Sequence, residues 1–519
     1  MLSTPLTVPG ALRAAAHRSG QQEALVDGAM RLSYAELLAA AEEAARALIA
    51  SGVRPGDRVA IWAPNGGRWA VAALGIHCAG AIVVPLNTRF RGSEAQHVLT
   101  TSGARLLFTV TDFLSTDYVA LLGTPPPALA EIVVLDGPDR GGTTSWSTFL
   151  GRAVAAPEAL PDVGPDDISD ILFTSGTTGA PKGAMLRHGA SVRAYTAWSD
   201  VVGLRDEDRY LILNPFFHAF GLKAGILASI LKGATIVPHP VFDVPSVMRM
   251  VDAERITMLP GPPTIYQTIL DHPERSQFDL SSLRLAVTGA AAVPVEMIRR
   301  MRSELTFKTI VTGYGLTEAT GIATMCRHDD DPETIASTAG RAIPNVEVCV
   351  IGSTGQRVPA GDAGEVVVRG YNVMAGFYGD PTATAEAIDA EGWLHTGDIG
   401  VLDGAGNLRI TDRVKDMFIV GGFNAYPAEI EGMILHHPDV GQVAVVGVPD
   451  HRLGEVGRAF VVPRAGAAID PARLIEWCRT EMANYKVPRS VEVVDALPLN
   501  ASGKVLKYEL RARGAAHST

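Results

Sequence analysis

The sequence has 519 residues, 47% of them hydrophobic, and a formal net charge of -11. This length exceeds what one hydrophobic core usually serves, so two or more domains are expected, and the acidic balance argues against a nucleic-acid partner. Four scattered cysteines without metal-ligand spacing are typical of a reduced protein. Because no signal-peptide pattern and no apolar run of transmembrane length is visible, we expect a cytoplasmic enzyme without an integral membrane span.

The N-terminal part of the chain alternates between helix and strand patterns. From Leu12 to about Gly52, apolar residues recur at helical spacing, and Gly52 stops the pattern. Short apolar strands then alternate with helices, which predicts parallel sheets covered by helices. The expected strands are 57–62, 80–85, 105–110, 132–135, 168–174, 210–214, 235–238, 258–260, 285–288 and 309–313.

The C-terminal part follows other patterns. From Val346, short alternating strands between glycine-rich turns predict a β-rich subdomain. From about Lys415, strands at 443–448, 459–462 and 490–494 and helices at 427–436 and 471–482 indicate a small α+β lid able to fold alone. We therefore predict an α/β protein with a large N-terminal domain, residues 1–412, and a small mobile C-terminal domain, residues 413–519.

A segment rich in glycine and hydroxyl side chains follows the apolar run Ile168 to Phe173. Its glycines allow backbone N–H groups to approach an anion, its hydroxyls add donors, and its lysine supplies a positive charge. The spacing is neither that of a Walker loop nor that of a dinucleotide fingerprint. A flexible surface loop is the alternative. The candidate phosphate-binding residues are Thr174, Ser175, Gly176, Thr177, Thr178, Gly179 and Lys182.

Further motifs follow predicted strands. His218 stands among aromatic residues, where packing is the common role of a histidine. The small residues Gly289, Ala290 and Ala291 form either a wall for a flat ring or a tight turn.

The hexapeptide from Gly313 to Glu318 is more specific. The Tyr314 ring can stack on a base beside Gly315, Thr317 can donate to a phosphate, and Glu318 can hold a hard cation or cap a helix.

Charged and glycine residues near the predicted domain boundary complete the set. Asp398 can accept from both ribose hydroxyls, with Arg413 on the other side, although surface ion pairs are the usual fate of such charges. Gly421 and Gly422, before Phe423, allow close approach of a thin ligand chain or simply form a turn.

Together these motifs resemble those of the acyl-adenylate-forming superfamily, which includes acyl-CoA synthetases, peptide-synthetase adenylation domains and beetle luciferases. The resemblance covers essentially the whole chain. It implies an adenine pocket at Gly289, Ala290 and Ala291, Mg²⁺ ligation by Glu318, and a catalytic lysine at Lys504. It also implies a hinge at Lys415, a thiol tunnel beside Gly421, Gly422 and Phe423, and a substrate-gating role for His218.

The implied reaction joins a carboxylic acid to CoA in two steps, with ATP and Mg²⁺, through an acyl-AMP that releases pyrophosphate and then AMP. Further stretches resemble bacterial CoA ligases that act on bicyclic propanoate fragments of steroid catabolism: 214–218, 259–266, 279–284 and 454–460. We expect a bulky apolar acid in a pocket built around Phe217, Phe220, Tyr266 and Ala319.

Several alternatives stay open at this point. A medium-chain or aromatic acyl-CoA ligase is one alternative, because it differs only in the shape of the acyl pocket, which no motif fixes. A stand-alone adenylating enzyme that loads a carrier protein is another reading, although no fused carrier module is visible. The sequence leaves the oligomeric state open, with a homodimer among the options. An idle nucleotide-sensing protein would be expected to lose Glu318 or Lys504, and both are present.

Overall fold

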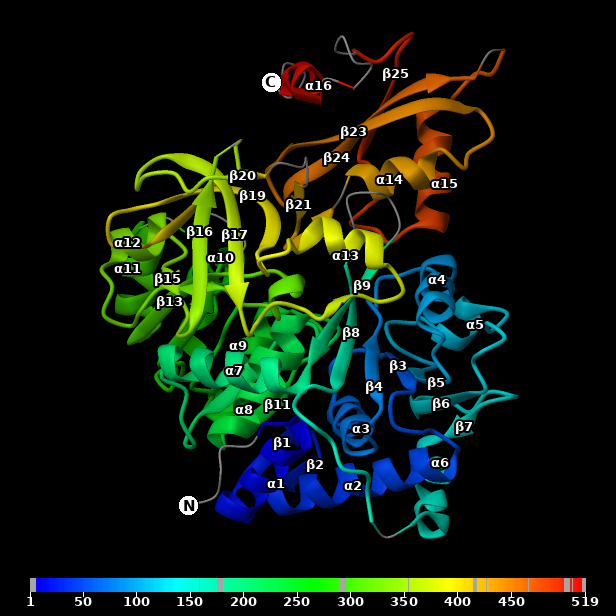
Figure 1. Ribbon diagram of the computed structural model, residues 1–519, viewed down its shortest axis with the longest axis vertical. Helices are drawn as coiled ribbons and strands as arrows, with labels where there is room; N and C mark the ends of the chain where they lie inside the picture. Colours follow the sequence, from blue (N-terminus) through cyan, green and yellow to red (C-terminus); the bar gives the residue numbers. More distant parts are fainter. Residues whose placement is uncertain are drawn as a thin grey trace. The chain divides into compact units, whose positions relative to one another are not determined.

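The computed structural model describes residues 6–157, 159–174, 181–289, 293, 295–352, 354–413, 418–425, 427–464, 466–498, 505 and 507–515. Contacts divide the chain into two compact units (Figure 1). The first comprises Met1–Thr88, Leu99–Leu172 and Gly183–Asp412, and the second comprises Arg89–Val98, Phe173–Lys182 and Arg413–Thr519. Within the described part of the chain, no helix combines the length and the apolar character needed to cross a bilayer.

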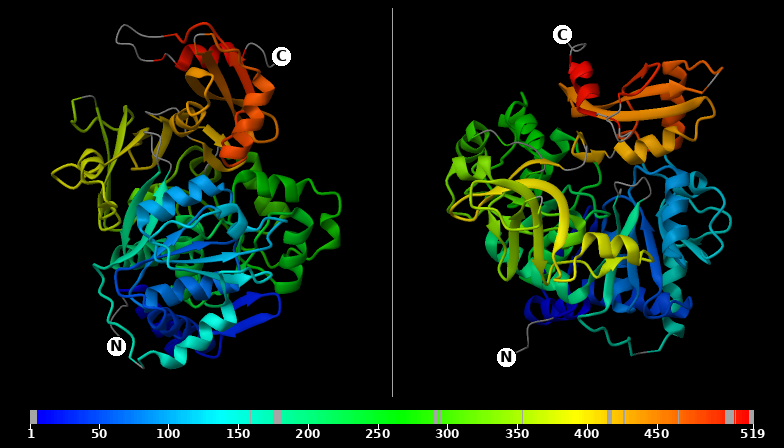
Figure 2. Two further views of the ribbon diagram at one scale, coloured as in Figure 1. Left: turned by 90° about the vertical axis from the view of Figure 1, so that its right-hand side faces the viewer. Right: turned by 45° about the horizontal axis from the view of Figure 1, so that its top comes forward.

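The largest sheet has eight strands in the order β18-β9-β8-β4-β3-β5-β6-β7. The pairs β3–β4, β3–β5, β4–β8 and β5–β6 are parallel, and β9–β18 is antiparallel. Figure 2 shows its central strands in blue and cyan with helices on both faces, which explains why these strands are mostly apolar. The bounds are β3 Arg58–Trp62, β4 Ile82–Pro85, β5 Leu106–Val110, β6 Glu131–Asp136, β7 Thr144–Ser145, β8 Ile168–Thr174, β9 Lys182–Arg187 and β18 Gly376–Phe377.

A second sheet has the order β10-β11-β1-β2, and bridges through Met258 continue it to β12 and β13. The pairs β1–β11, β10–β11 and β12–β13 are parallel. The carboxyl ends of β10, β12 and β13 therefore lie at one edge, where parallel sheets bind ligands. The bounds are β1 Glu23–Asp27, β2 Met30–Ser33, β10 Arg209–Ile212, β11 Thr235–Pro238, β12 Leu285–Thr288 and β13 Thr309–Tyr314.

Several helices begin at a residue whose side chain accepts from a free N–H group of the first turn. The Ser33 hydroxyl accepts from the N–H of Glu36, while the Glu36 carboxylate accepts from the N–H of Ser33, which forms a capping box at α2. The bounds are α1 Val8–Ser19, α2 Tyr34–Ala50, α3 Gly67–Cys78, α4 Gly92–Ser102, α5 Tyr118–Leu122, α6 Trp146–Leu150, η1 Gly151–Ala155, α7 His188–Val202, η2 Phe220–Leu227, α8 Ala228–Lys232, α9 Val244–Glu254, α10 Pro263–Leu270, η3 Arg275–Gln277, α11 Val295–Glu304, η4 Thr317–Ala319, α12 Pro332–Ser337 and α13 Pro381–Ala387.

The predicted β-rich subdomain is confirmed. An antiparallel sheet has the order β16-β17-β19-β20, and two short strands, β14 and β15, extend the edge of β13. The bounds are β14 Thr324–Met325, β15 Arg341–Ala342, β16 Val346–Ile351, β17 Ala363–Gly370, β19 Leu394–Leu402 and β20 Leu408–Arg413.

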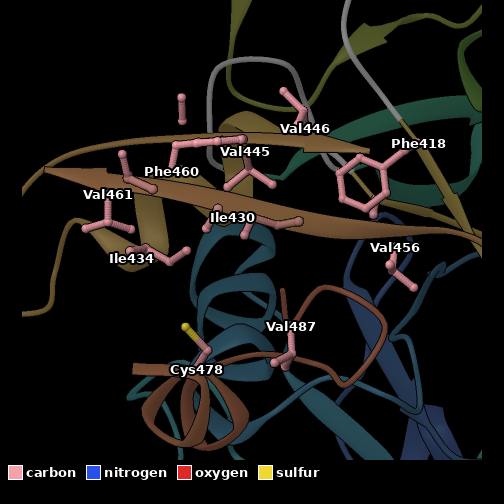
Figure 3. Close-up of a cluster of buried hydrophobic side chains, with 14 of the residues drawn as sticks. Phe418, Ile430, Ile434, Val445, Val446, Val456, Phe460, Val461, Cys478 and Val487 are labelled. Carbon is pink, nitrogen blue, oxygen red and sulfur yellow. The ribbon is translucent and has the colours of Figure 1, made fainter. Parts of the chain in front are cut away.

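The C-terminal part of the second unit is the predicted α+β fold. Its sheet has the order β22-β21-β24-β23, with β25 parallel to β24. Figure 3 shows its apolar core, in which Val445 and Phe460 of the sheet meet Ile430 of a helix. The bounds are β21 Phe418–Val420, β22 Phe423–Ala425, α14 Pro427–Ile434, β23 Val440–Asp450, β24 Gly454–Pro463, α15 Pro471–Glu481, β25 Ser490–Val493 and α16 Lys507–Ala515.

Two of the predicted elements differ in the structure. The helical pattern between Leu12 and Gly52 is interrupted by the hairpin β1–β2, whose turn contains Gly28 at a φ of +58°. The strand expected at 258–260 is reduced to single bridges at Met258. Pro260 explains the reduction, because proline has no N–H to donate to a neighbouring strand.

Candidate active site

The ends of β12 and β13 bring two predicted nucleotide-binding segments together. Gly289 follows β12 directly, and Gly313 and Tyr314 are the last residues of β13. A Cβ at Gly289 would lie 3.6 Å from the carbonyl oxygen of Gly313, so the two glycines are neighbours. This arrangement places Gly289 close to the main chain just before Tyr314.

The Tyr314 side chain also contacts Asp398, the residue that is predicted to bind the ribose hydroxyls. Its hydroxyl donates to the Asp398 carboxylate, with an oxygen–oxygen distance of 2.6 Å. Asp398 lies in β19 and is only 4% exposed. The fold therefore joins two candidate residues that are 84 positions apart in the sequence.

Thr317 and Glu318 lie in η4, a short 3-10 helix. The chain reaches it through a close backbone approach, since a Cβ at Gly315 would lie 2.3 Å from the carbonyl oxygen of Gly321. The N–H of Met374 donates to the main-chain oxygen of Glu318 at 2.8 Å. These backbone contacts fix η4, while the side chains of Thr317 and Glu318 stay half-buried.

The residues around Glu318 fit a magnesium ion that is shared with substrate. Among the described residues, no group of three or more histidine, cysteine, aspartate and glutamate side chains is placed to hold a metal. Mg²⁺ is usually held by one or two carboxylates together with substrate phosphates. A single half-buried glutamate beside a threonine hydroxyl suits that mode of binding.

The segment that carries His218 is held by a residue that the sequence analysis missed. The buried Asn65 side chain donates to the carbonyl oxygen of Ile212 at 3.2 Å and to that of Asn214 at 3.0 Å. Its own oxygen accepts from the N–H of Phe216 at 2.7 Å. One amide therefore fixes the turn after β10. Its position in Ala-Pro-Asn-Gly-Gly, after a predicted strand, was a weak signal that the sequence offered.

The element after His218, η2, is a π-helix, which was not predicted. Such helices are rare and are frequently found at functional sites. Gly221 allows η2 to pack on the preceding turn, because a Cβ there would lie 2.1 Å from the carbonyl oxygen of Pro215. At its start, the Phe220 ring meets Trp198 edge to face, with ring centroids 6.2 Å apart.

The His218 ring is accessible to solvent, yet protein surrounds it closely enough that desolvation lowers its pKa. Its Nδ1 accepts from the N–H of Phe220 at 3.2 Å. This bond requires an unprotonated Nδ1, so the neutral ring carries its proton on Nε2. His218 is therefore placed to donate one hydrogen bond from Nε2.

The expected acyl-pocket residues fall into two groups. Phe217 and Phe220 are half-buried, whereas Tyr266 and Ala319 have no exposed surface. The Tyr266 hydroxyl donates to the carbonyl oxygen of Leu259 at 2.8 Å, and its ring packs edge to face on Phe307. These contacts give Tyr266 a place in the core of the fold.

The remaining predicted residues are at strand ends or outside the described residues. Thr174 ends β8, Lys182 begins β9, and Arg413 is the last residue of β20. Gly421 and Gly422 form the turn between β21 and β22 at φ values of +56° and +85°, and the Phe423 ring stacks on Tyr485. The predicted residues outside the described ones are Ser175, Gly176, Thr177, Thr178, Gly179, Ala290, Ala291, Lys415 and Lys504.

The chain belongs to the AMP-binding enzyme family. Residues 12–378 match the AMP-binding enzyme domain, and residues 429–504 match the AMP-binding enzyme C-terminal domain. The prediction of an AMP-forming acid–thiol ligase, which uses ATP and CoA, is confirmed.

Two curated relatives share half of the sequence. The chain is 50% identical to a 3-[(3aS,4S,7aS)-7a-methyl-1,5-dioxo-octahydro-1H-inden-4-yl]propanoyl:CoA ligase of Rhodococcus jostii, over 98% of this chain and 99% of that protein. It is 51% identical to a ligase of the same name from Mycobacterium tuberculosis, over 99% of this chain and 100% of that protein.

A solved structure is also similar. A double mutant of o-succinylbenzoate CoA synthetase from Bacillus subtilis, bound with its product analogue OSB-NCoA, matches with a TM-score of 0.83 and 29% identity. The match covers 96% of this chain and 97% of that chain.

Proposed function

We propose that this ligase activates a bicyclic, ring-ketone-bearing propanoate of the kind left by partial steroid-ring breakdown. The observation that carries the proposal is the 50% and 51% identity, along essentially the full length, to two ligases named for that substrate. Selectivity for an acid depends on many positions of the acyl pocket, and similarity over the whole chain includes those positions.

The surroundings of His218 agree with such an acid. Phe217, Phe220 and Trp198 are aromatic, and Phe220 packs on Trp198. The segment 214–222 contains no acidic residue to pair with a substrate ammonium group. A bulky apolar carboxylate without an α-amino group is therefore favoured over an amino acid.

The first half-reaction needs two anions to meet. The substrate carboxylate attacks the α-phosphorus of ATP, and pyrophosphate leaves. We assign Lys182 and Lys504 to offset the negative charge of the phosphates, with Thr317 as a hydroxyl donor. Glu318 would hold Mg²⁺, which supplies further neutralisation of phosphate charge when bound. No covalent bond to the protein is required.

His218 has a distinct part in this step. Because Nδ1 accepts from the N–H of Phe220, Nε2–H is the donor that remains. We assign it to orient the substrate carboxylate, which accepts hydrogen bonds but donates none when ionised. Desolvation lowers the pKa of His218, which favours the neutral ring that this donor role uses.

Nucleotide binding is assigned to the residues around β13 and β19. Tyr314 would stack on adenine beside Gly289, and Asp398 would accept from the ribose hydroxyls. The hydrogen bond between Tyr314 and Asp398 supports this assignment, because it holds a ring and a carboxylate in one fixed arrangement. Arg413 is assigned to the same ribose or phosphate.

The second half-reaction transfers the acyl group to the CoA thiol and releases AMP. We assign the turn of Gly421 and Gly422 to the pantetheine tunnel, since positive φ values and the lack of a Cβ leave the backbone accessible. Lys415 is the proposed hinge for exchange between the two half-reactions.

The test is mass spectrometry of the purified protein with Mg-ATP and a panel of acids, each with and without CoA. The panel contains bicyclic keto-propanoates, cinnamic-type aromatic acids and medium-chain fatty acids. Preferred conversion of a bicyclic propanoate to its acyl-CoA, with AMP release, is the expected result. Preference for an aromatic or medium-chain acid would refute the bicyclic propanoate as substrate and assign that acid in its place. Accumulation of acyl-AMP that CoA does not consume would indicate a carrier-protein acceptor.

A further inference from the structure

A charged cluster is buried beneath the segment that carries His218. Lys223, in the π-helix η2, has no exposed surface, and its ammonium group forms an ion pair with Asp170 of β8, which is also fully buried. The Nε2 of His77, on α3, lies 3.2 Å from the other carboxylate oxygen of Asp170. Each oxygen of this carboxylate therefore has a partner from a different helix.

The contacts around Asp170 favour the ionised form of its carboxylate. Burial raises the pKa of Asp170, but the charges of Lys223 and His77 and their hydrogen bonds outweigh burial and lower it overall. Burial lowers the pKa of Lys223, and the charge of Asp170 opposes that change. A buried ion pair of this kind is a poor source of stability, because apolar residues of similar volume often serve as well or better. Its presence calls for another reason.

The cluster ties three elements together at one point. Asp170 stands in β8 four residues before Thr174, where the predicted phosphate loop begins. The Ser169 hydroxyl lies 3.5 Å from the Lys223 ammonium group and 3.1 Å from the carbonyl oxygen of Leu186 in β9. The strands on both sides of the phosphate loop are thus joined to the helix that follows His218.

The ion pair at Lys223 bears on the register of η2, because η2 is a π-helix. Loss of the wide turns in favour of ordinary α-helix would shift the residues on one side of the change by one position, which is a rotation of about 100°. Phe220 and the preceding His218 would then turn away from their present places. A single ionic contact at Lys223, three residues into η2, opposes that shift.

We propose that Lys223 and Asp170 are positioning residues for the carboxylic acid: the pair fixes the register of η2 against β8, so that Phe217 and His218 meet the acid in the orientation needed for adenylation. This inference rests on the proposed role of His218 as a ligand of the acid. Neither member of the pair touches the substrate.

The experiment compares Lys223→Met with the double variant Lys223→Met/Asp170→Asn. In the single variant the buried carboxylate keeps His77 but loses its ammonium partner, so both thermal stability and activity should fall. The double variant removes both charges, while the new amide oxygen still accepts from His77. We expect it to regain most of the melting temperature but to keep a KM for the acid raised about tenfold or more, with KM for ATP near that of the wild type.

A matched control separates positioning from general destabilisation. Arg284 and the buried Asp208 form another ion pair in the first unit. Asp208 comes just before β10, whereas His218 comes after it, so the two residues are at opposite ends of this strand. The variant Arg284→Met/Asp208→Asn should lower the melting temperature and leave KM for the acid unchanged.

The outcomes are distinguishable from failure of the proposed function. Wild-type protein that converts no acid of the panel would overturn the proposed function and this inference with it. An active wild type together with a double variant of normal KM for the acid would overturn the positioning role alone. If the double variant does not fold, Asp170→Asn is used: a raised KM for the acid supports the inference, and an unchanged KM overturns it.

Discussion

Replacing Tyr314 with phenylalanine tests the nucleotide site directly. The change removes one oxygen atom and keeps the ring that is assigned to stack on adenine. It also removes the donor that contacts the Asp398 carboxylate at 2.6 Å. The expected defect is therefore confined to the ribose contact, because the carboxylate loses the donor that orients it toward the two hydroxyls.

The size of the effect follows from the nature of the bond. An oxygen–oxygen distance of 2.6 Å between a hydroxyl and a carboxylate is typical of a strong, charge-assisted bond. Hydrogen bonds to charged groups contribute about 1.5 to 3 kcal/mol, and each 1.4 kcal/mol is a factor of about ten. We expect kcat/KM for ATP to fall about 10- to 100-fold, with KM for the acid little changed.

The assay is pyrophosphate release at saturating acid with varied Mg-ATP. Tyr34→Phe is the matched control, because the buried Tyr34 hydroxyl hydrogen-bonds to the carbonyl oxygens of Ala234 and Ser229, and none of these residues is assigned to the nucleotide. The control should lose stability and keep its KM for ATP. A Tyr314→Phe enzyme whose kcat/KM for ATP stays within about twofold of the wild type would refute the role given to this bond.

Four further changes give separate tests. Glu318→Gln should slow adenylation about 10²- to 10³-fold, as measured by pyrophosphate release; a near-normal rate would contradict metal binding there. Lys504→Ala should abolish acyl-adenylate formation and spare thioester formation from supplied acyl-adenylate, so equal loss of both would contradict its role. Gly221→Ala should lower the melting temperature more than Gly225→Ala, because the new Cβ would lie 2.1 Å from a backbone oxygen in the first variant and 3.0 Å from the Ile212 side chain in the second. The reverse order of melting temperatures would count against this packing argument. Burial, and next the neighbouring His77, lower the pKa of His188, whose Nδ1 accepts from the N–H of Val8. As pH falls below about 6.5, His188 therefore binds a proton in the unfolded chain but not in the folded one, and the folded state loses stability. The loss of melting temperature between about pH 7.5 and 5.5 should be smaller in His188→Asn than in the wild type. An equal loss would refute this explanation.

Local pattern was sufficient to predict the class of fold. Apolar runs such as β5, in which every residue is buried, mark strands covered on both faces, and Pro427 and Pro471 mark the starts of α14 and α15. The motif at Gly313 to Glu318 likewise falls at the carboxyl end of a strand, where a parallel sheet binds its ligands. Such features are decided within a few residues.

Contacts between distant segments were beyond reach of a single sequence. No local pattern pairs the Tyr314 hydroxyl with Asp398, 84 residues later, and the context of Asn65 does not identify the turn after β10 that it holds. The hairpin β1–β2 was missed for a related reason. Its second strand has no fully buried residue, so apolar periodicity does not reveal it.

The π-helix and its buried ion pair show what evidence the sequence did contain. Ile-Ser-Asp-Ile-Leu-Phe-Thr reads as a buried strand with one acidic residue, Asp170, and Phe-Gly-Leu-Lys-Ala-Gly-Ile-Leu reads as an apolar helix with one basic residue, Lys223. Each charge alone is most simply interpreted as an exposed side chain. Because burial of an unpaired charge is prohibitive, two opposite charges that each interrupt an otherwise buried element are candidates to be partners. That rule makes Lys223 one candidate partner for Asp170, and it places the departure from the apolar pattern beside the residue that the reaction is proposed to use.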